Sequence, residues 1–287
     1  MELYANKWKD YELIDAGNKE KLERWGNVIL RRPDPTAIWP IKDYRKWNKT
    51  DGYYHRSNKG GGEWSFSKTL PEYWTVSYGE LTFKVSPTGF KHTGLFPEQA
   101  ANWDYIIDKI SQAGREIKVL NLFAYTGAAT MAASYGGASE VVHVDASKGM
   151  VSWAKENMTL SHLEDHKIRF IVDDVVKFVE REERRGNHYD VIIMDPPSYG
   201  RGTNKEVWQL EDKLYELILK CKAILSDDPL FFLVNTYTTG FSALALANIM
   251  QEVLSENFTS LSYGQLGLPI SDRKMILPCG IYGRYEN

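Results

Sequence analysis

The chain alternates short apolar runs with longer segments of mixed polarity from residue 119 onward. Runs rich in apolar residues lie at 119–122, 140–144, 168–172, 189–194 and 230–236, without internal proline or glycine. Such runs are typical of strands buried in a parallel sheet. The segments 98–110, 128–135, 210–224 and 241–254 carry helical patterns. We therefore predict an α/β fold whose central sheet is mostly parallel.

The segment 119–138, VLNLFAYTGAATMAASYGGA, predicts a strand, a tight turn and a helix of small residues. A turn of this kind places free backbone N–H groups at the carboxyl end of a strand, where α/β proteins bind ligands. The phosphate-binding patterns GxGxxG and GxxxxGK[ST] are both missing from it. The turn therefore favours a nucleoside ligand without a pyrophosphate, and an ordinary βα turn is the alternative.

Acidic residues follow three of the other predicted strands. Asp145 ends the second strand, Asp173 and Asp174 follow the third, and DPPSY at 195–199 follows the fourth. The spacing from the first turn to Asp145 is close to the roughly 20 residues expected for an acid that binds ribose hydroxyls. Because parallel strands end at one edge of a sheet, these acids are expected to gather there.

At this point the chain resembles class I S-adenosylmethionine-dependent methyltransferases. It is most similar to the bacterial large-subunit ribosomal RNA methyltransferases that act on cytosine C5 or guanine N7. The resemblance covers roughly residues 81–287. The segments that carry it are GFKHTGLFPEQ (89–99), LNLFAYTGA (120–128), VDAS (144–147), DDVVKF (173–178) and DPPSYGRG (195–202).

The resemblance implies a Rossmann-like sheet of seven strands whose last hairpin is reversed, here at 260–266 and 274–282. It also implies S-adenosyl-L-methionine as cofactor. Asp145 is then the partner of the ribose hydroxyls, and Asp174 that of the adenine amine. The segment at 89–99 closes over the methionine end, although Ala100 stands where the family often has Arg. The implied cofactor-binding residues are Lys91, Thr93, Gln99, Phe123, Ala124, Tyr125, Thr126, Gly127, Asp145, Ala146, Ser147, Asp174, Val175 and Asp195.

The DPPSY segment is the expected reaction edge. Two prolines fix the backbone there, and an acid or carbonyl beside them can hold a target amine or ring nitrogen. Tyr199 can stack on a flipped base. A purely structural turn is the alternative. The candidate catalytic residues are Asp195, Pro196, Pro197, Tyr199 and Asn235.

Methylation of cytosine C5 requires a cysteine that adds to C6. In the C5 branch of the resembled family this cysteine follows the fifth strand. The chain has Asn-Thr-Tyr-Thr at positions 235–238 and no cysteine there. The sequence therefore favours a nitrogen target, guanine N7 among the options, with Asn235 as a contact to the base edge.

Composition adds limits to this interpretation. The chain has 287 residues, of which 43% are hydrophobic and 25% charged, and its net charge is −3. No apolar run approaches the ~20 residues of a membrane span, and residues 1–17 contain no apolar signal core. The two cysteines, Cys221 and Cys279, have no metal-binding spacing, and Cys221 lies in an apolar helical pattern. We expect a cytoplasmic protein without a metal, of undetermined oligomeric state.

The first 85 residues predict a small β-rich domain, followed by a methyltransferase domain at 86–287. A short helical turn is expected at 19–25, a strand at 27–31, and a hairpin at 73–78 and 81–85. Residues 1–60 hold 13 Lys and Arg against 9 Asp and Glu, and four tryptophans. Such a stretch can grip RNA through phosphate contacts and stacking. The alternative is that its aromatic residues form a core.

Three functions remain open from the sequence. The first is a methyltransferase whose partner is RNA, with ribosomal RNA expected. The second is a methyltransferase of a protein or small molecule, which the acidic balance of residues 61–287 would suit. The third is a non-catalytic cofactor-binding protein that binds RNA, and the intact DPPSY segment argues against it.

Overall fold

The computed structural model describes residues 1–57, 61–201 and 207–287. The chain forms two compact units. Unit 1 comprises Met1–Leu3, Asn102–Leu266 and Gly280–Asn287, and unit 2 comprises Tyr4–Ala101 and Gly267–Cys279. The domain boundary proposed from the sequence, after residue 85, stays a prediction.

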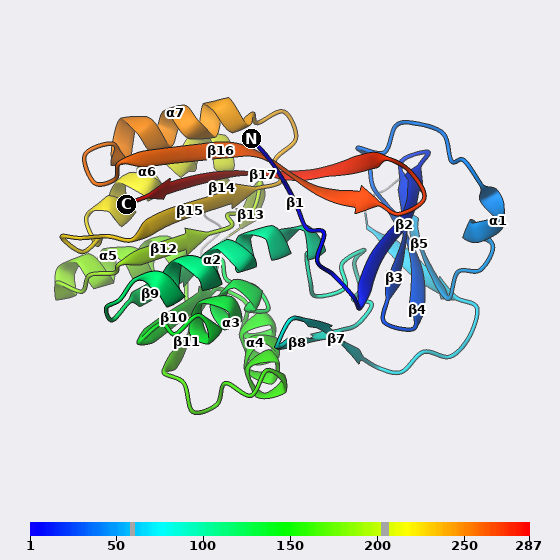
Figure 1. Ribbon diagram of the computed structural model, residues 1–287, viewed down its shortest axis with the longest axis horizontal. Helices are drawn as coiled ribbons and strands as arrows, with labels where there is room; N and C mark the ends of the chain where they lie inside the picture. The colour runs from blue at the N-terminus through cyan, green and yellow to red at the C-terminus, as the bar shows by residue number, and fades with distance from the viewer. Residues whose placement is uncertain (58–60, 202–206) are drawn as a thin grey trace. The chain divides into compact units, whose positions relative to one another are not determined.

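Unit 1 is built on a mostly parallel sheet with strand order β11-β10-β9-β12-β15-β17-β16 (Figure 1). The first five strands pair in parallel, and β17 pairs antiparallel with β15. The predicted order of five parallel strands followed by a reversed pair is thereby confirmed. The strands are β9 (Lys118–Leu122), β10 (Glu140–Asp145), β11 (Ile168–Val172), β12 (Val191–Met194), β15 (Phe231–Thr236), β16 (Ser260–Ile270) and β17 (Met275–Glu286).

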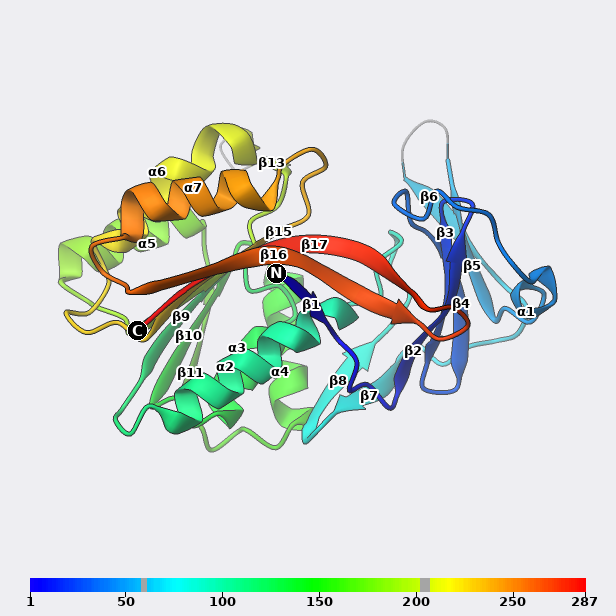
Figure 2. The same cartoon turned by 45° about the horizontal axis from the view of Figure 1, so that its top comes forward.

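Helices cover both faces of this sheet, which explains why its strands are apolar on both sides. Figure 2 shows α2, α3 and α4 on one side and α5, α6 and α7 on the other. The helices are α2 (Ala100–Gln112), α3 (Ala128–Tyr135), α4 (Lys148–Leu160), α5 (Val175–Arg185), α6 (Leu210–Lys222) and α7 (Ala243–Leu254). The predicted helices at 98–110, 128–135, 210–224 and 241–254 correspond to α2, α3, α6 and α7.

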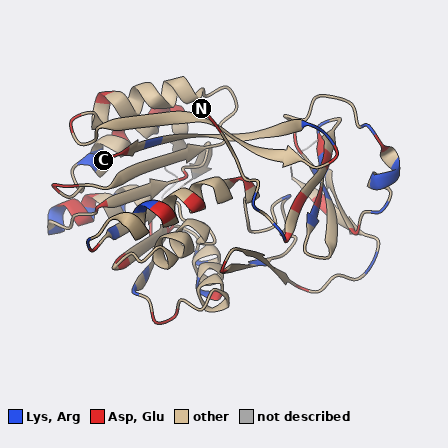
Figure 3. Cartoon of the chain, viewed as in Figure 1, with Lys and Arg blue, Asp and Glu red and all other residues tan. Residues whose placement is uncertain are grey.

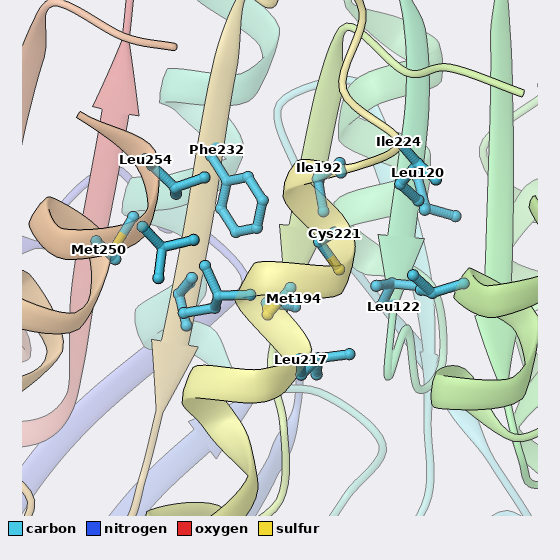
Figure 4. Close-up of a cluster of buried hydrophobic side chains, with 14 of the residues drawn as sticks. Leu120, Leu122, Ile192, Met194, Leu217, Cys221, Ile224, Phe232, Met250 and Leu254 are labelled. Carbon is cyan, nitrogen blue, oxygen red and sulfur yellow. The ribbon is translucent and has the colours of Figure 1, made fainter. Parts of the chain in front are cut away.

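The face under α5, α6 and α7 holds a continuous apolar core (Figure 4). Leu122, Met194 and Phe232 of the strands meet Leu217 and Cys221 of α6 there, and all five are fully or almost fully buried. Burial of each large side chain contributes about 1.5–3 kcal/mol. The apolar pattern around Cys221 predicts a core position, and the structure confirms it.

Two short strands follow β12. β13 (Tyr199–Arg201) and β14 (Val207–Gln209) pair antiparallel, so the chain turns back after DPPSY and then enters α6. The sequence also predicts a basic loop at 200–205, and most of it lies outside the described residues, which omit 202–206. At the other end of the chain, β1 (Glu2–Tyr4) pairs with β16. Within the described ranges, no helix is long and apolar enough to cross a membrane.

Unit 2 is rich in strands, as the sequence predicts for this region. The hairpin of β7 and β8 confirms the one expected at 73–85, and β4 confirms the strand expected at 27–31. The short helices are η1 and α1, at Pro97–Gln99 and Tyr44–Trp47. The strands are β2 (Tyr11–Gly17), β3 (Glu20–Trp25), β4 (Val28–Pro33), β5 (Gly52–Arg56), β6 (Gly62–Phe66), β7 (Trp74–Tyr78) and β8 (Leu81–Val85).

The helical turn predicted at 19–25 is wrong. This segment forms β3, which pairs antiparallel with both β2 and β4. Glu23 breaks the alternation of apolar and polar residues expected of a strand, because this charged side chain is fully buried. Its carboxylate accepts hydrogen bonds from Arg32 Nε at 2.7 Å and from the Tyr11 hydroxyl at 2.8 Å. Arg32 holds the pKa of Glu23 down, at about 2, against the effect of burial.

The aromatic residues of the first stretch largely form the core of unit 2. Trp25 and Trp47 are 0% and 3% exposed. Arg31 pairs with Glu20 and lies 4.1 Å from the centre of the Tyr53 ring, so this cation is engaged inside the unit. Figure 3 shows basic and acidic segments next to each other on these strands. Of the two interpretations of this stretch, the structure favours the aromatic core.

Candidate cofactor and acceptor site

The strand register of unit 1 brings the predicted site residues into one row. The residues that pair across the sheet at the ends of four buried strands are Val144, Leu122, Met194 and Val234. The residues that follow them in the chain are Asp145, Phe123, Asp195 and Asn235. Phe123 has left-handed backbone and packs against the apolar core under α5, α6 and α7. Asn235 faces the other side of the sheet, where it bonds to Asn102 of α2. The register therefore places four predicted residues from four strands in one row at the carboxyl edge.

The turn after β9 has an unusual backbone. Phe123 and Tyr125 have φ of 52° and 50°, and Gly127 has φ of 83°. Left-handed backbone at a residue other than glycine costs about 1–3 kcal/mol and is concentrated at functional sites. Two such residues in one turn indicate that the surrounding structure imposes this shape.

Asp145 holds this turn in place. Its Oδ2 accepts the backbone N–H of Tyr125 at 2.9 Å, and its Oδ1 accepts that of Ser147 at 2.8 Å. Burial raises the pKa of Asp145, and the two N–H donors act against the rise. A carboxylate oxygen has two lone pairs, so each oxygen can still accept a further hydrogen bond. The geometry suits a carboxylate that binds a diol.

Asn157 supports the same turn from α4. Its Nδ2 donates to the carbonyl oxygen of Thr126 at 2.8 Å, and its side chain is fully buried. Gly127, which follows Thr126, is the N-cap of α3. A Cβ atom at Gly127 would come within 3.0 Å of the Ala154 Cβ, also on α4. Helix α4 therefore packs closely against the turn, and a side chain at Gly127 would crowd Ala154.

The two acids after β11 have different roles in the structure. Asp173 pairs with Arg181 and accepts the N–H of Asp174 at 2.8 Å. Asp174 is the N-cap of α5, because its Oδ1 accepts the N–H of Lys177 at 3.0 Å. Its Oδ2 makes no hydrogen bond within the described residues, and the helix starts at Val175. This oxygen and the first N–H groups of α5 are available to a ligand.

The expected reaction edge, called the acceptor edge below, runs from Asp195 to Tyr199. Asp195 is half-buried, Pro196 is buried, and Tyr199 is 55% exposed. The Ser198 hydroxyl accepts a hydrogen bond from the Thr238 hydroxyl at 2.8 Å, which ties this segment to the end of β15. Tyr199 therefore presents an aromatic face to solvent next to a fixed backbone.

Trp208 also belongs to this edge, and the sequence interpretation did not include it. Its Nε1 donates to the Pro197 carbonyl at 2.6 Å, and its ring lies 5.4 Å from that of Phe123, centre to centre. It stands opposite Gly200 in the β13–β14 hairpin. The sequence could have indicated Trp208 through the pairing of residues 199–201 with 207–209. In a cross-strand pair of tryptophan and glycine, the tryptophan ring lies over the glycine.

Asn235 lies deeper than a residue at an open edge. It is 3% exposed, and its Oδ1 accepts a hydrogen bond from Asn102 Nδ2 at 2.7 Å. The predicted contact between Asn235 and a base stays a prediction.

The three residues predicted at the methionine end of the cofactor lie in unit 2. The Lys91 carbonyl accepts a hydrogen bond from Arg32 at 2.8 Å, and burial together with neighbouring cations lowers the pKa of the Lys91 amine. Thr93 is fully buried, and among the residues described its hydroxyl has no partner. Gln99 is buried in η1. A buried hydroxyl without a partner is costly, which fits a ligand-binding role for Thr93.

Residues 52–227 match the pattern of the S-adenosylmethionine-dependent methyltransferase family. This match covers more than half of the chain. The chain belongs to this family. The methyltransferase is also similar to a solved S-adenosylmethionine-dependent methyltransferase from Agrobacterium tumefaciens. The two are 38% identical, the TM-score is 0.94, and the match covers 100% of this chain and 93% of that one.

Two further similarities are informative. A methyltransferase structure complexed with SAH shares 19% identity at a TM-score of 0.75, covering 98% of this chain and 76% of that one, which supports the fold. The ribosomal RNA large subunit methyltransferase K/L of Shewanella frigidimarina is 34% identical over 68% of this chain. The chain spans about a quarter of the length of that relative, 26%.

The described residues of the methyltransferase fit its cofactor, S-adenosylmethionine. Asp145 offers spare lone pairs beside the turn after β9, and Asp174 offers a carboxylate oxygen without a hydrogen bond in the described residues, one strand away. Within the described part of the chain, no group of three or more His, Cys, Asp or Glu side chains could hold a metal ion.

Proposed function

We propose that this methyltransferase transfers a methyl group to a ring or exocyclic nitrogen of a base in ribosomal RNA. The observation that carries the proposal is the row of Asp145, Phe123, Asp195 and Asn235 at one edge of the sheet. It places the carboxylate assigned to the cofactor and the acceptor edge in one row of the sheet, with β9 between their strands. The relatives named as ribosomal RNA large subunit methyltransferases support RNA as the substrate.

The cofactor residues divide the work. We assign the ribose hydroxyls to Asp145, and the adenine amine to Asp174 with the N–H of Val175 beside it. The turn at 123–127 presents its backbone to the amino acid part, together with Ala146 and Ser147 after β10. Lys91, Thr93 and Gln99 are assigned to the methionine end.

The reaction places modest demands on the protein. The cofactor supplies a methyl group on a sulfonium, whose leaving group needs no proton. The chain therefore contributes mainly by holding the acceptor atom in line. Asp195 and the rigid Pro196-Pro197 backbone are assigned to hold the nitrogen to be methylated. Exposed Tyr199 is assigned to stack on the base.

The cysteines favour nitrogen over carbon. Positions 235–238 contain no cysteine. Cys221 is fully buried in the apolar core, and burial raises the pKa of its thiol well above the usual value. Burial also raises the pKa of the Cys279 thiol. Both shifts oppose the thiolate that carbon methylation would need.

Mass mapping of ribosomal RNA from cells with and without the gene tests the proposal. We expect one nucleotide to lose a methyl group from a base nitrogen when the gene is deleted, and the purified enzyme to restore it. Unchanged ribosomal RNA would refute the substrate and direct the search to a protein or small molecule. Binding of RNA should also weaken steeply with salt, because phosphate contacts release counterions.

A further inference from the structure

Three buried polar side chains of unit 1 form a chain of hydrogen bonds that ends at the acceptor edge. Asn102 is on α2, Asn235 is on β15 and Arg284 is on β17, and they are 1%, 3% and 7% exposed. Arg284 Nε donates to Asn102 Oδ1 at 3.1 Å, and its Nη2 donates to the same oxygen. Asn102 Nδ2 donates to Asn235 Oδ1 at 2.7 Å.

The direction of this chain follows from the chemistry of arginine. An asparagine amide can usually be turned over, since its oxygen and nitrogen have nearly the same shape. A guanidinium has only donors. The Asn102 atom that meets Arg284 must therefore be the oxygen, so its nitrogen faces Asn235. Asn235 must in turn offer its oxygen, which leaves its Nδ2 directed away from Asn102.

Arg284 is itself held firmly. Its guanidinium lies 4.2 Å from the centre of the Tyr105 ring and 4.9 Å from that of Tyr282. Burial lowers the pKa of Arg284, although Tyr105, Tyr282 and Glu286 act in the opposite direction. Arginine keeps its proton in proteins at physiological pH, so it stays a donor. The orientation of Asn235 is therefore the same throughout the working range of the enzyme.

Asn235 Nδ2 makes no hydrogen bond within the described residues, and it is not among their buried unpartnered atoms. Asn235 lies in the same row as Asp195, on the neighbouring strand. We propose that Asn235 is a specificity-determining residue whose N–H donates to a carbonyl oxygen of the acceptor base, with Asn102 and Arg284 as its positioning residues. Guanine O6, uracil O4 and cytosine O2 meet this requirement, whereas adenine has no carbonyl oxygen. The inference rests on the proposed function, because it uses the same acceptor edge.

Two isosteric variants test the proposal. Asn235→Asp replaces the donor by a carboxylate oxygen at the same place. Asn102→Asp keeps the acceptor for Arg284 but cannot donate, so Asn235 must turn over and present its oxygen. Both should retain SAH affinity within about twofold. Both should lower kcat/KM for ribosomal RNA by roughly 10- to 100-fold, because the oxygen of residue 235 would then face the carbonyl oxygen of the base, and neither can donate a hydrogen bond. Arg284→Lys should keep the orientation and most activity, since lysine also only donates.

Asn187→Asp is the matched control. Asn187 donates to Glu182 at 2.8 Å beyond the end of α5, away from the acceptor edge. It should leave kcat/KM for ribosomal RNA unchanged. Full activity of both Asn102→Asp and Asn235→Asp, or a methyl group mapped to an adenine, would overturn the inference while leaving RNA methylation intact.

A readout without RNA separates the two proposals. In isotope-labelled protein, the side-chain amide protons of Asn235 should exchange with water faster than those of Asn102, which are bonded to Asn235 Oδ1. In Asn102→Asp, the exchange at Asn235 should slow down, because its protons then bond to the new carboxylate. Exchange at Asn235 that does not slow in Asn102→Asp would refute the orientation even if the enzyme methylates no RNA.

Discussion

Single residues set the shape of the turn after β9, which we propose binds the cofactor. Phe123 and Tyr125 adopt a backbone that glycine prefers, while the true glycine, Gly127, is packed against α4. The energy stored at the first two positions must be offset by the hydrogen bonds of Asp145 and Asn157. If this turn binds the cofactor as we propose, it is held in that shape before the cofactor arrives, which lowers the cost of ordering it on binding.

Gly127→Ala should destabilise the protein and weaken cofactor binding. Left-handed backbone costs alanine about 1–2 kcal/mol, and the Cβ contact at 3.0 Å with Ala154 adds about 1–3 kcal/mol. Gly137→Ala is the control, because Gly137 has φ of 93° but nothing within 4 Å of its would-be Cβ. Denaturant unfolding and SAH calorimetry measure both effects. Equal losses in the two variants would contradict the packing argument.

Asp145→Ala should weaken SAH binding by about 10- to 100-fold, because a hydrogen bond to a charged group contributes about 1.5–3 kcal/mol. Calorimetry measures this, with Asp165→Ala, in an exposed turn, as the control. Unchanged affinity would remove Asp145 from the site.

The affinity of the unaltered protein for SAH should fall in acid. Burial raises the pKa of Asp145 above its usual value. As the pH falls through this raised pKa, the carboxylate takes up a proton and loses its acceptor capacity. The loss should therefore begin at a higher pH than for an exposed aspartate, whose pKa is about 3.9. Calorimetry across this range checks the sign, and a loss confined to lower pH would refute it.

At the scale of elements, the β13–β14 hairpin braces both halves of the site. Trp208 bonds to the backbone of the DPPSY segment and packs beside Phe123 of the cofactor turn. Phe123 is far from Trp208 in the sequence. The contact between their rings therefore depends on the β13–β14 hairpin, which places Trp208. The element after β12 is therefore part of the site as well as a connection to α6.

Trp208→Phe should lower kcat/KM by about three- to tenfold, because it loses one hydrogen bond of about 0.5–1.5 kcal/mol. Trp208→Ala should cost more, since it also removes the ring beside Phe123. Val207→Ala on the same strand is the control, because Val207 is 52% exposed. Methyl transfer and SAH affinity are the measurements, and no difference between Trp208→Ala and Val207→Ala would refute the bracing role.

At the scale of the whole molecule, the chain has only two cysteines, so thiol chemistry can be removed completely. The double variant Cys221→Ala, Cys279→Ser should retain methyl transfer within about threefold. It should lose roughly 1–2 kcal/mol of stability, because Cys221 fills space in the core. Methyl transfer measured below the unfolding temperature of the variant shows whether the reaction needs a thiol. Loss of transfer with intact SAH binding would revive methylation of carbon through a thiol adduct.

Local patterns predicted much of the fold. The buried strands of unit 1 are apolar runs, because helices cover both faces, and the helices between them have their own periodicity. Local patterns are less informative in unit 2. The segment of β3 has the pattern of a helical turn, because Glu23 is buried with a partner nine residues away on β4. A buried charge looks like a surface residue until its partner is known.

The sequence by itself determined the alternation of strands and helices, and it placed Asp145, Asp174 and Asp195 at strand ends, because these features depend on neighbours along the chain. Tertiary structure alone decided which of them meet, since the register of parallel strands is set by packing. It also decided the orientation of Asn235. That orientation depends on Asn102, 133 residues away, and on Arg284, 182 residues from Asn102. Hydrogen bonds between such distant residues leave no periodic trace, and they exist only once the sheet and α2 are assembled.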